Sequence, residues 1–307
     1  MDCSGFVRTV SKEMKLTQLT KPTAQPRIGS PLAWKKPLAV RVPLDMVNSA
    51  GRRPHEDALP LGRLARLSLS VIGRSILYYP VLESTVDTAK GMAMAGVCEG
   101  TVVLAGQQTA GRGRMGRLWV STPGSSILMS VILHPAVSQL AALNMLAGLA
   151  VVRTIERLGA VRAAIKWPND VLLNGRKVCG ILVENTFAAG ELQASIVSPG
   201  LNVRLDVSPF SEIRDAATSL SSELRRDVSP EEVVPLLIKE MDRLYSDLQQ
   251  GAPVFEQWLS RVETLGKRVT VRSGDSVEEG FAESILADGS LVLRRSDGSV
   301  VTVVTGE

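Results

Sequence analysis

The sequence has few of the residues that build metal centres or disulfide frameworks. It contains 3 cysteines and 2 histidines among 307 residues, and the cysteines stand far apart at Cys3, Cys98 and Cys179. An odd number of widely spaced cysteines argues against a disulfide scaffold and favours a reducing compartment, so we expect a cytoplasmic protein. His55 and His134 are isolated, which argues against a Cys/His metal site or a Ser/His/Asp triad.

Long uninterrupted apolar runs are also missing. No run reaches the roughly 18 residues that cross a bilayer. The longest candidate, 140–158, is interrupted by Asn144, Arg153 and Glu156 and predicts an amphipathic helix. Residues 1–30 contain no apolar segment of a secretory signal. We therefore expect neither a membrane span nor a secretion signal.

Acidic residues are absent from one long stretch of the chain. No Asp or Glu occurs between Glu99 and Glu156, and this stretch contains Gly-Arg-Gly-Arg-Met-Gly-Arg-Leu-Trp at 111–119. Glycines let successive backbone N–H groups converge into an anion cradle, and arginines add forked donors that suit phosphate. The segment therefore predicts a loop that closes over a negatively charged ligand.

This loop contains the pattern G-x-G-x-x-G of dinucleotide-binding folds, but its surroundings exclude such a fold. Ser-Thr-Pro-Gly at 121–124 breaks a helix where the fingerprint needs one. No acidic residue follows about 20 positions on, and no Gly-Lys-Ser/Thr completes a Walker loop. By itself the segment could equally be a solvated basic turn.

A second segment gives the loop a partner. Lys-Trp-Pro-Asn-Asp at 166–170 is followed by an apolar run, Asn-Gly at 174–175, and another apolar run at 178–185. Asn-Gly between two such runs is a strong signal of a β-hairpin. The hairpin is expected to bring Lys166 and Lys177 near one end of a sheet.

Together the two segments resemble the biotin protein ligases (biotin–[acetyl-CoA-carboxylase] ligases). That family carries G-R-G-R-x-G-R-x-W and K-W-P-N-D … G-x-K-x-x-G-I-L-x-E in the same order, and the resemblance runs from about Tyr78 to the C-terminus. It implies ATP-dependent ligation of biotin to a lysine of a biotin carboxyl carrier domain, through biotinyl-5′-AMP. The implied partner is acetyl-CoA carboxylase or a related carboxylase; ATP and biotin are the substrates and Mg²⁺ the expected cation.

The apolar patterns predict an α+β catalytic domain over residues 61–262. The resemblance implies the mixed sheet of class II aminoacyl-tRNA synthetases and biotin ligases for this domain, and a small SH3-like β-barrel for residues 263–307. A short helix is expected to lead into a strand at 75–79. Further strands are expected near 101–106, 126–133, 162–166, 171–173, 178–185, 192–198, 200–205, 268–273, 278–286, 291–294 and 300–304. Helices are expected from 84, at 139–159, from 229 to about 250 and at 253–262.

The N-terminal quarter is basic and rich in proline. Residues 1–75 hold 13 Lys/Arg and 5 Asp/Glu, and prolines recur at positions 22, 26, 31, 37, 43, 54 and 60. We expect residues 1–60 to be a disordered extension. This proline spacing would break the helices of a helix-turn-helix. We therefore expect a monofunctional ligase that does not bind DNA.

The resemblance assigns residues to biotin, several of them close to the glycine–arginine loop. Ser84 and Thr85 would bond the ureido ring while capping a helix. The family usually has Asn at the next position, where this chain has Val86. The full biotin set implied by resemblance is Ser84, Thr85, Val86, Gln108, Arg112, Gly113, Arg114 and Lys177.

The resemblance also assigns residues to ATP and the adenylate. Lys166, with Arg112 and Arg114, would stabilise charge at the α-phosphate. Asp170 is the expected Mg²⁺ ligand. The ATP and adenylate set implied by resemblance is Gly111, Gly116, Arg117, Lys166, Asn169 and Asn202.

Some positions depart from the motif or allow a structural role. Ser198 and Pro199 stand where the family has the first glycine of G-x-G-x-N. Trp119 could stack in the site, but a tryptophan after a loop is more often a core anchor, and the anchor is the favoured role. Cys179 is expected to be a small packing residue.

Two other functions remain open at this stage. The first is a lipoate or octanoate ligase or transferase of the same fold. The second is a biotin-responsive transcriptional repressor, which would need an ordered helix-turn-helix before Tyr78. Edge strands of the sheet could pair two subunits as a homodimer.

Overall fold

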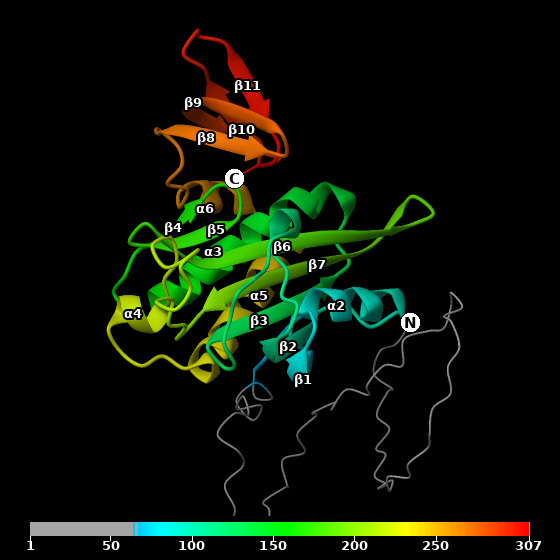
Figure 1. Ribbon diagram of the computed structural model, residues 1–307. Coiled ribbons are helices and arrows are strands. Elements are labelled where there is room, and N and C mark those ends of the chain that lie inside the picture. The colour runs from blue at the N-terminus through cyan, green and yellow to red at the C-terminus, as the bar shows by residue number, and fades with distance from the viewer. Residues whose placement is uncertain (1–63, 65–66, 307) are drawn as a thin grey trace, which may run out of the picture. The chain divides into compact units, whose positions relative to one another are not determined.

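The computed structural model describes Leu64 and residues 67–306 (Figure 1). In this part of the chain, seven strands form one mixed sheet in the order β1-β2-β3-β7-β6-β5-β4. β1 runs parallel to β2, and all other neighbours are antiparallel. The strands are Ser75–Leu82 (β1), Thr101–Gln108 (β2), Ser126–Leu133 (β3), Ala163–Lys166 (β4), Asp170–Leu173 (β5), Arg176–Ala188 (β6) and Glu191–Asn202 (β7). The predicted mixed sheet is confirmed.

Helices cover both faces of this sheet (Figure 1). Because side chains alternate along a strand, β2 sends Val102 and Leu104 into one apolar cluster and Val103 into another. α3 and α5 belong to the first cluster and α2 to the second. The helices are Thr85–Met94 (α2), Leu140–Leu158 (α3), Leu220–Leu224 (α4), Pro230–Gln249 (α5) and Val254–Leu259 (α6), with 3₁₀ turns Arg114–Gly116 (η1) and Val137–Gln139 (η2).

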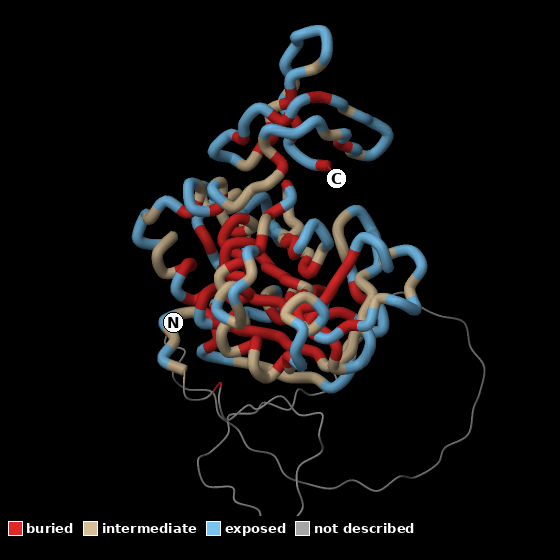
Figure 2. Tube along the Cα trace, turned by 90° about the vertical axis from the view of Figure 1, so that its left-hand side faces the viewer, coloured by how far each residue is buried: buried red, intermediate tan, exposed pale blue. Residues whose placement is uncertain are grey.

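α3 is a core helix. With the turn before it, the segment Val137–Leu158 is long and apolar enough to cross a bilayer by length and composition. Most of its length is nevertheless buried within the protein, against the sheet, α5 and α6 (Figure 2). Its apolar surface is therefore already covered by protein.

The predicted hairpin and helix starts are present. Asn174 and Gly175 form the two-residue turn between β5 and β6, and both have positive φ, at 49° and 75°. Ser84 caps α2 and Ser229 caps α5, each accepting a hydrogen bond from the backbone N–H three residues on. Pro230 occupies the first position of α5, where its missing N–H costs nothing.

The strand pair predicted at 192–198 and 200–205 is one continuous strand, β7. Its pairing with β6 runs through Pro199, which lies opposite Ile181. Its pairing with β3 passes from Val197 directly to Gly200, leaving two positions without a partner. A proline in a central strand is tolerated here because the ladder is open on the β3 side.

The segment before β1 is fastened to α5 by one buried carboxylate. Asp242 accepts hydrogen bonds from the backbone N–H groups of Ser70, Val71 and Ile72 at 2.7–2.8 Å. The helix expected before β1 is not present at residues 67–74, which are turn or irregular; most of residues 61–66, and the extension at 1–60, lie outside the described residues.

The C-terminal strands form a separate four-stranded antiparallel sheet in the order β11-β10-β9-β8. The strands are Arg268–Ser273 (β8), Ser276–Ile285 (β9), Leu291–Arg294 (β10) and Val300–Val303 (β11). The antiparallel sheet agrees with the sequence pattern, while its closure into an SH3-like barrel stays a prediction. Trp167 Nε1 donates to Gly289 O at 2.8 Å, which links the two sheets.

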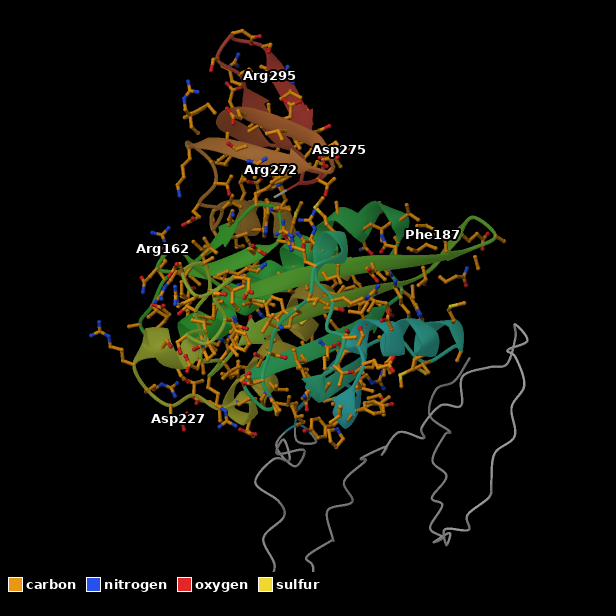
Figure 3. All side chains as sticks on the ribbon, viewed as in Figure 1. Arg162, Phe187, Asp227, Arg272, Asp275 and Arg295 are labelled. Atoms are coloured by element: carbon orange, nitrogen blue, oxygen red, sulfur yellow. The ribbon has the colours of Figure 1, made fainter. Side chains whose placement is uncertain are left out.

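The β6–β7 hairpin extends past the neighbouring strands. It carries Phe187 near its tip, pointing away from the rest of the sheet (Figure 3). The opposite end of the same two strands borders the site described next.

Candidate active site

A cavity of about 470 Å³ lies where the glycine–arginine loop meets the sheet. Twelve of the fifteen predicted site residues line it. They come from α2, β2, the loop at 111–119, the β4–β5 connection and strands β6 and β7. The twelve are Thr85, Val86, Gln108, Arg112, Gly113, Arg114, Arg117, Lys166, Asn169, Asp170, Lys177 and Asn202.

Three predicted residues do not line the cavity and have structural roles beside it. Ser84 is buried, and its hydroxyl accepts from the backbone N–H of Asp87. Gly111 lies so close to Trp119 that a Cβ would meet its carbonyl oxygen at 2.9 Å. Gly116 has a φ of 74° in the η1 turn, which favours glycine.

One end of the cavity carries uncharged polar groups joined in a hydrogen-bonded row. The backbone N–H and the hydroxyl of Thr85 both donate to Gln108 Oε1, at 2.6 and 2.9 Å. Ser130 Oγ donates to Thr85 Oγ1 at 2.9 Å and lies 2.8 Å from Ser198 Oγ. This end can recognise a ligand that is polar but carries no charge.

The other end carries cations. Lys177 Nζ lies 2.7 Å from Asp170 Oδ1 and 5.8 Å from the centroid of the Trp119 ring. Lys166 and Arg117 also border the cavity, and both are exposed. Anionic groups of a ligand are attracted to this end.

Trp119 is part of the cavity wall, which agrees with the stacking role that the sequence left open and not with the favoured role of core anchor. It is half-buried, and its ring packs on the backbones of Gly180 and Gly200. A Cβ at these glycines would come within 3.0 Å and 2.8 Å of the ring. Two glycines on adjacent strands leave a flat surface for the indole, which the sequence pattern did not reveal.

Arg112 joins the loop to two elements, α2 and β6, by ion pairs. Its Nη2 lies 2.8 Å from Glu184 Oε2 on β6 and 3.0 Å from Asp87 Oδ1 on α2. Lys90 of α2 pairs with the same Glu184 carboxylate. These ion pairs bring the loop across the cavity from α2 to β6.

Arg114 joins the same loop to the β4–β5 connection and to the segment after β11. Its Nη1 donates to Asn169 Oδ1 at 2.8 Å, and its Nη2 donates to Thr305 Oγ1 at 2.6 Å. Asn169 is itself fixed, because its Nδ2 donates to Ile181 O. The two motif segments identified in the sequence, the loop and Lys166–Asp170, are thus joined directly by a hydrogen bond.

Asn202 and Cys179 are buried and have structural roles. Asn202 is buried and donates from Nδ2 to Thr218 O at 3.0 Å, which fixes the segment after β7. Cys179 is fully buried, and burial raises the pKa of its thiol well above the usual range. The prediction that Cys179 is a packing residue is confirmed, since a buried neutral thiol is a poor nucleophile.

The sequence reasoning missed part of the lining. The segment after β7 lies over the cavity because Lys177 N donates to Ala216 O and Thr218 N donates to Lys177 O. No local periodicity marks this segment, and only the tertiary pairing brings it to the site. The other lining residues not predicted include Met129, Trp167, Leu172, Ser198, Glu212 and Ile213.

The residues at the cavity do not form a metal centre by themselves. Among the described residues, no group of three or more His, Cys, Asp or Glu side chains could hold a metal ion. Asp170 is engaged with Lys177. Its prediction as a magnesium ligand therefore remains a prediction.

Comparisons with known proteins identify the class. A model of the biotin/lipoate A/B protein ligase family matches residues 78–202. The chain is 35% identical over 237 residues to the bifunctional ligase/repressor BirA of Bacillus subtilis, covering 76% of this chain and 73% of that protein. The chain therefore belongs to the biotin/lipoate A/B protein ligase family.

Two further matches are named as biotin ligases. A biotin–[acetyl-CoA-carboxylase] ligase of Paracoccus denitrificans is 38% identical over 210 residues, covering 65% of this chain and 86% of that protein. A solved structure of biotin protein ligase from Aquifex aeolicus, in complex with biotin and ATP, superposes with a TM-score of 0.65 and 27% identity. That match covers 76% of this chain and 97% of the other.

Proposed function

We propose that this protein is a biotin protein ligase, which activates biotin with ATP and transfers it to a lysine of a biotin carboxyl carrier domain. The observation that carries the proposal is a single cavity with an uncharged polar end, a cationic end and an arginine loop bonded across it. The charge distribution of biotin is complementary to this cavity, because its ureido ring is neutral and polar and its carboxylate is anionic.

The first step needs alignment of two anions and little covalent chemistry from the protein. Thr85 and Gln108 bind the ureido ring, and Trp119 covers the apolar part of the ligand. The carboxylate and the α-phosphate then meet at the cationic end, where Lys166 and Arg114 offset their mutual repulsion. Attack of a carboxylate oxygen on the α-phosphorus releases pyrophosphate and forms biotinyl-5′-AMP.

The second step needs protection from water until the acceptor arrives. The loop lies over the cavity and is bonded through Arg112 to α2 and β6 and through Arg114 to Asn169. It thereby shields the mixed anhydride from hydrolysis. A carrier lysine attacks the carbonyl carbon and AMP leaves, so no side chain of this chain becomes covalently modified.

A magnesium ion would accompany ATP rather than occupy a site built by the protein. Mg²⁺ is commonly held by one or two carboxylates together with phosphate oxygens. Asp170 is a carboxylate of the cavity lining, and it is paired with Lys177. It fits the role of a single supporting ligand at most.

A lipoate or octanoate ligase fits this cavity less well. The head of either ligand is apolar and would leave the amide N–H₂ of Gln108 and the free lone pair of Ser198 Oγ facing an apolar group. Unpaired buried polar groups cost about 1–3 kcal/mol each. The polar end of the cavity therefore favours biotin.

The remaining elements of the proposal concern organisation. We assign catalysis to residues 61–262 and an SH3-like barrel to 263–307, and we place the protein in the cytoplasm with its carboxylase substrate. Deleting residues 1–60 is expected to leave ligation intact. A loss of folding in that deletion variant would show that the extension is part of the catalytic unit.

The function is tested by pyrophosphate exchange into ATP, measured with biotin, lipoate and octanoate side by side. We expect exchange with biotin and transfer of labelled biotin to an apo carrier domain. Exchange with lipoate or octanoate, and none with biotin, would overturn the proposal.

A further inference from the structure

The direction of the hydrogen bonds in the polar row at Gln108, Thr85, Ser130 and Ser198 is fixed from one end. A backbone N–H can only donate, so the bond from Thr85 N makes Gln108 Oε1 the acceptor. Thr85 Oγ1 then donates its one hydroxyl proton to the same oxygen. Ser130 Oγ in turn donates its one proton to Thr85 Oγ1.

Ser198 has one remaining choice. The hydrogen bond at 2.8 Å between Ser130 Oγ and Ser198 Oγ needs one proton, and that of Ser130 is already used. Ser198 must therefore donate to Ser130. Its own oxygen keeps a lone pair and has no proton left to offer.

The members of the row differ in what they show to the ligand. Gln108, Thr85 and Ser198 line the cavity, while Ser130 is completely buried and does not. Ser198 is 7% exposed, so its lone pair is directed to the cavity or to a buried contact, not to bulk solvent. On the cavity side it acts as a hydrogen-bond acceptor only.

The break in the sheet makes this position possible. Ser198 and Pro199 are the two residues of β7 left out of the pairing with β3. Ser130 of β3 faces this gap with its hydroxyl bonded to Ser198. The side-chain bond thus joins β3 and β7 where their backbone ladder is interrupted.

We infer that Ser198 is a specificity-determining residue that accepts a hydrogen bond from one ring N–H of the ureido group of biotin. The inference rests on the proposed function, which brings a neutral ring with two N–H donors to this end of the cavity. A ligand with a hydrogen-bond acceptor at this point would place its lone pair against that of Ser198 Oγ. No proton would lie between the two acceptors, so binding of such a ligand is disfavoured.

The test measures binding by calorimetry to the full-length protein. The ligands are biotin and two lactam analogues, in each of which CH₂ replaces one ring N–H. One of the two analogues lacks the N–H that donates to Ser198. Wild type is expected to bind that analogue about fivefold to tenfold more weakly than biotin, which is the usual effect of losing one neutral hydrogen bond. Ser198→Ala should lose a similar factor for biotin and no further factor for that analogue.

Ser195→Ala is the matched control. Ser195 is a completely buried serine on the same strand, bonded to Asn185 Oδ1 at 2.7 Å, and it does not line the cavity. Its variant should bind biotin like wild type. The comparison of the two lactams with wild-type protein needs no variant, so the inference stays testable if Ser198→Ala does not fold.

The outcomes separate the inference from the function. If Ser198→Ala binds biotin as tightly as wild type, or loses affinity equally for biotin and both lactams, Ser198 does not accept from a ring N–H. Binding of both lactams by wild type as tightly as biotin would overturn the inference as well. If wild type does not bind biotin at all, the proposed function is wrong, and this assignment with it.

Discussion

Arg114 Nη2 donates to Thr305 Oγ1 at 2.6 Å, which joins the glycine–arginine loop to the segment just after β11. The same guanidinium donates to Gly306 O at 3.3 Å and to Asn169. The C-terminal segment therefore helps to hold the loop that covers the cavity, although it lines no part of that cavity.

Replacing Thr305 by Val is expected to release biotinyl-5′-AMP about threefold faster, because the exposed contact contributes a modest share of loop anchoring. Arg114→Gly removes all three contacts and should release it faster still. The rate of adenylate release is measured after rapid dilution. Thr302→Val, on the exposed side of β11, is the control. Release by Arg114→Gly at the wild-type rate would show that Arg114 does not retain the intermediate.

Gly200→Ala should displace the Trp119 ring and weaken biotin binding by about tenfold or more, since a Cβ there comes within 2.8 Å of the indole. Adding Trp119→Phe should recover part of the loss by giving the new methyl room. Gly148→Ala in α3 is the control, because its Cβ would make ordinary contacts at 3.5 Å with the side chains of Ile165 and Ile181. An unchanged affinity in Gly200→Ala, measured by calorimetry, would show that the ring is free to move.

Asp170→Asn distinguishes two roles of one carboxylate. If Asp170 orients Lys177, as their 2.7 Å separation indicates, the variant should bind biotin about threefold to tenfold more weakly even in EDTA. A metal ligand would instead show normal biotin binding and a defect confined to the ATP-dependent step. Calorimetry with biotin in EDTA, followed by pyrophosphate exchange across a range of Mg²⁺ concentrations, separates these outcomes.

Glu223 should contribute to stability in a pH-dependent way. Burial acts to raise the pKa of its carboxyl, but hydrogen bonds from Thr218 and Asn174 and the charge of Arg176 outweigh burial, so the pKa is lowered. A lowered pKa means stabilisation that is fully present above the ordinary glutamate pKa of about 4.3 and is lost as the pH falls below it.

Glu223→Gln is therefore expected to unfold about 1–3 kcal/mol more easily at pH 7, with a smaller difference from wild type at pH 3–4. Urea unfolding at both pH values measures this. Glu283→Gln removes an exposed pair with Arg294 and should change the free energy of unfolding by about 0.5 kcal/mol or less. A difference between Glu223→Gln and wild type that does not depend on pH would contradict the account.

Local signals predicted local structure well. The Asn174–Gly175 turn and the caps Ser84 and Ser229 depend on backbone geometry within a few residues, and all three are present. Most predicted site residues also meet in one cavity. They could be predicted because two long and specific motifs, at 111–119 and 166–184, identify the family whose pattern supplies the rest.

Long-range relationships could not be predicted in this way. The position of Trp119 depends on two glycines 61 and 81 residues further along the chain, and the polar row joins α2, β2, β3 and β7. The sequence pattern predicts two strands, at 192–198 and 200–205, where β7 is continuous through Pro199. The open rung on the β3 side, which lets a central strand accept proline, becomes visible only when the register is known.

The anchoring of the chain before β1 by Asp242 has a consequence for synthesis on the ribosome. Ile72 and Asp242 are separated by 170 residues, so the partner of this early segment is made only after all seven strands of the large sheet. During elongation, the segment before the edge strand β1 therefore lacks its hydrogen bonds to Asp242 until α5 has emerged from the ribosome. Asp242→Ala should consequently reduce the yield of soluble protein during translation more than it reduces the activity of the molecules that do fold.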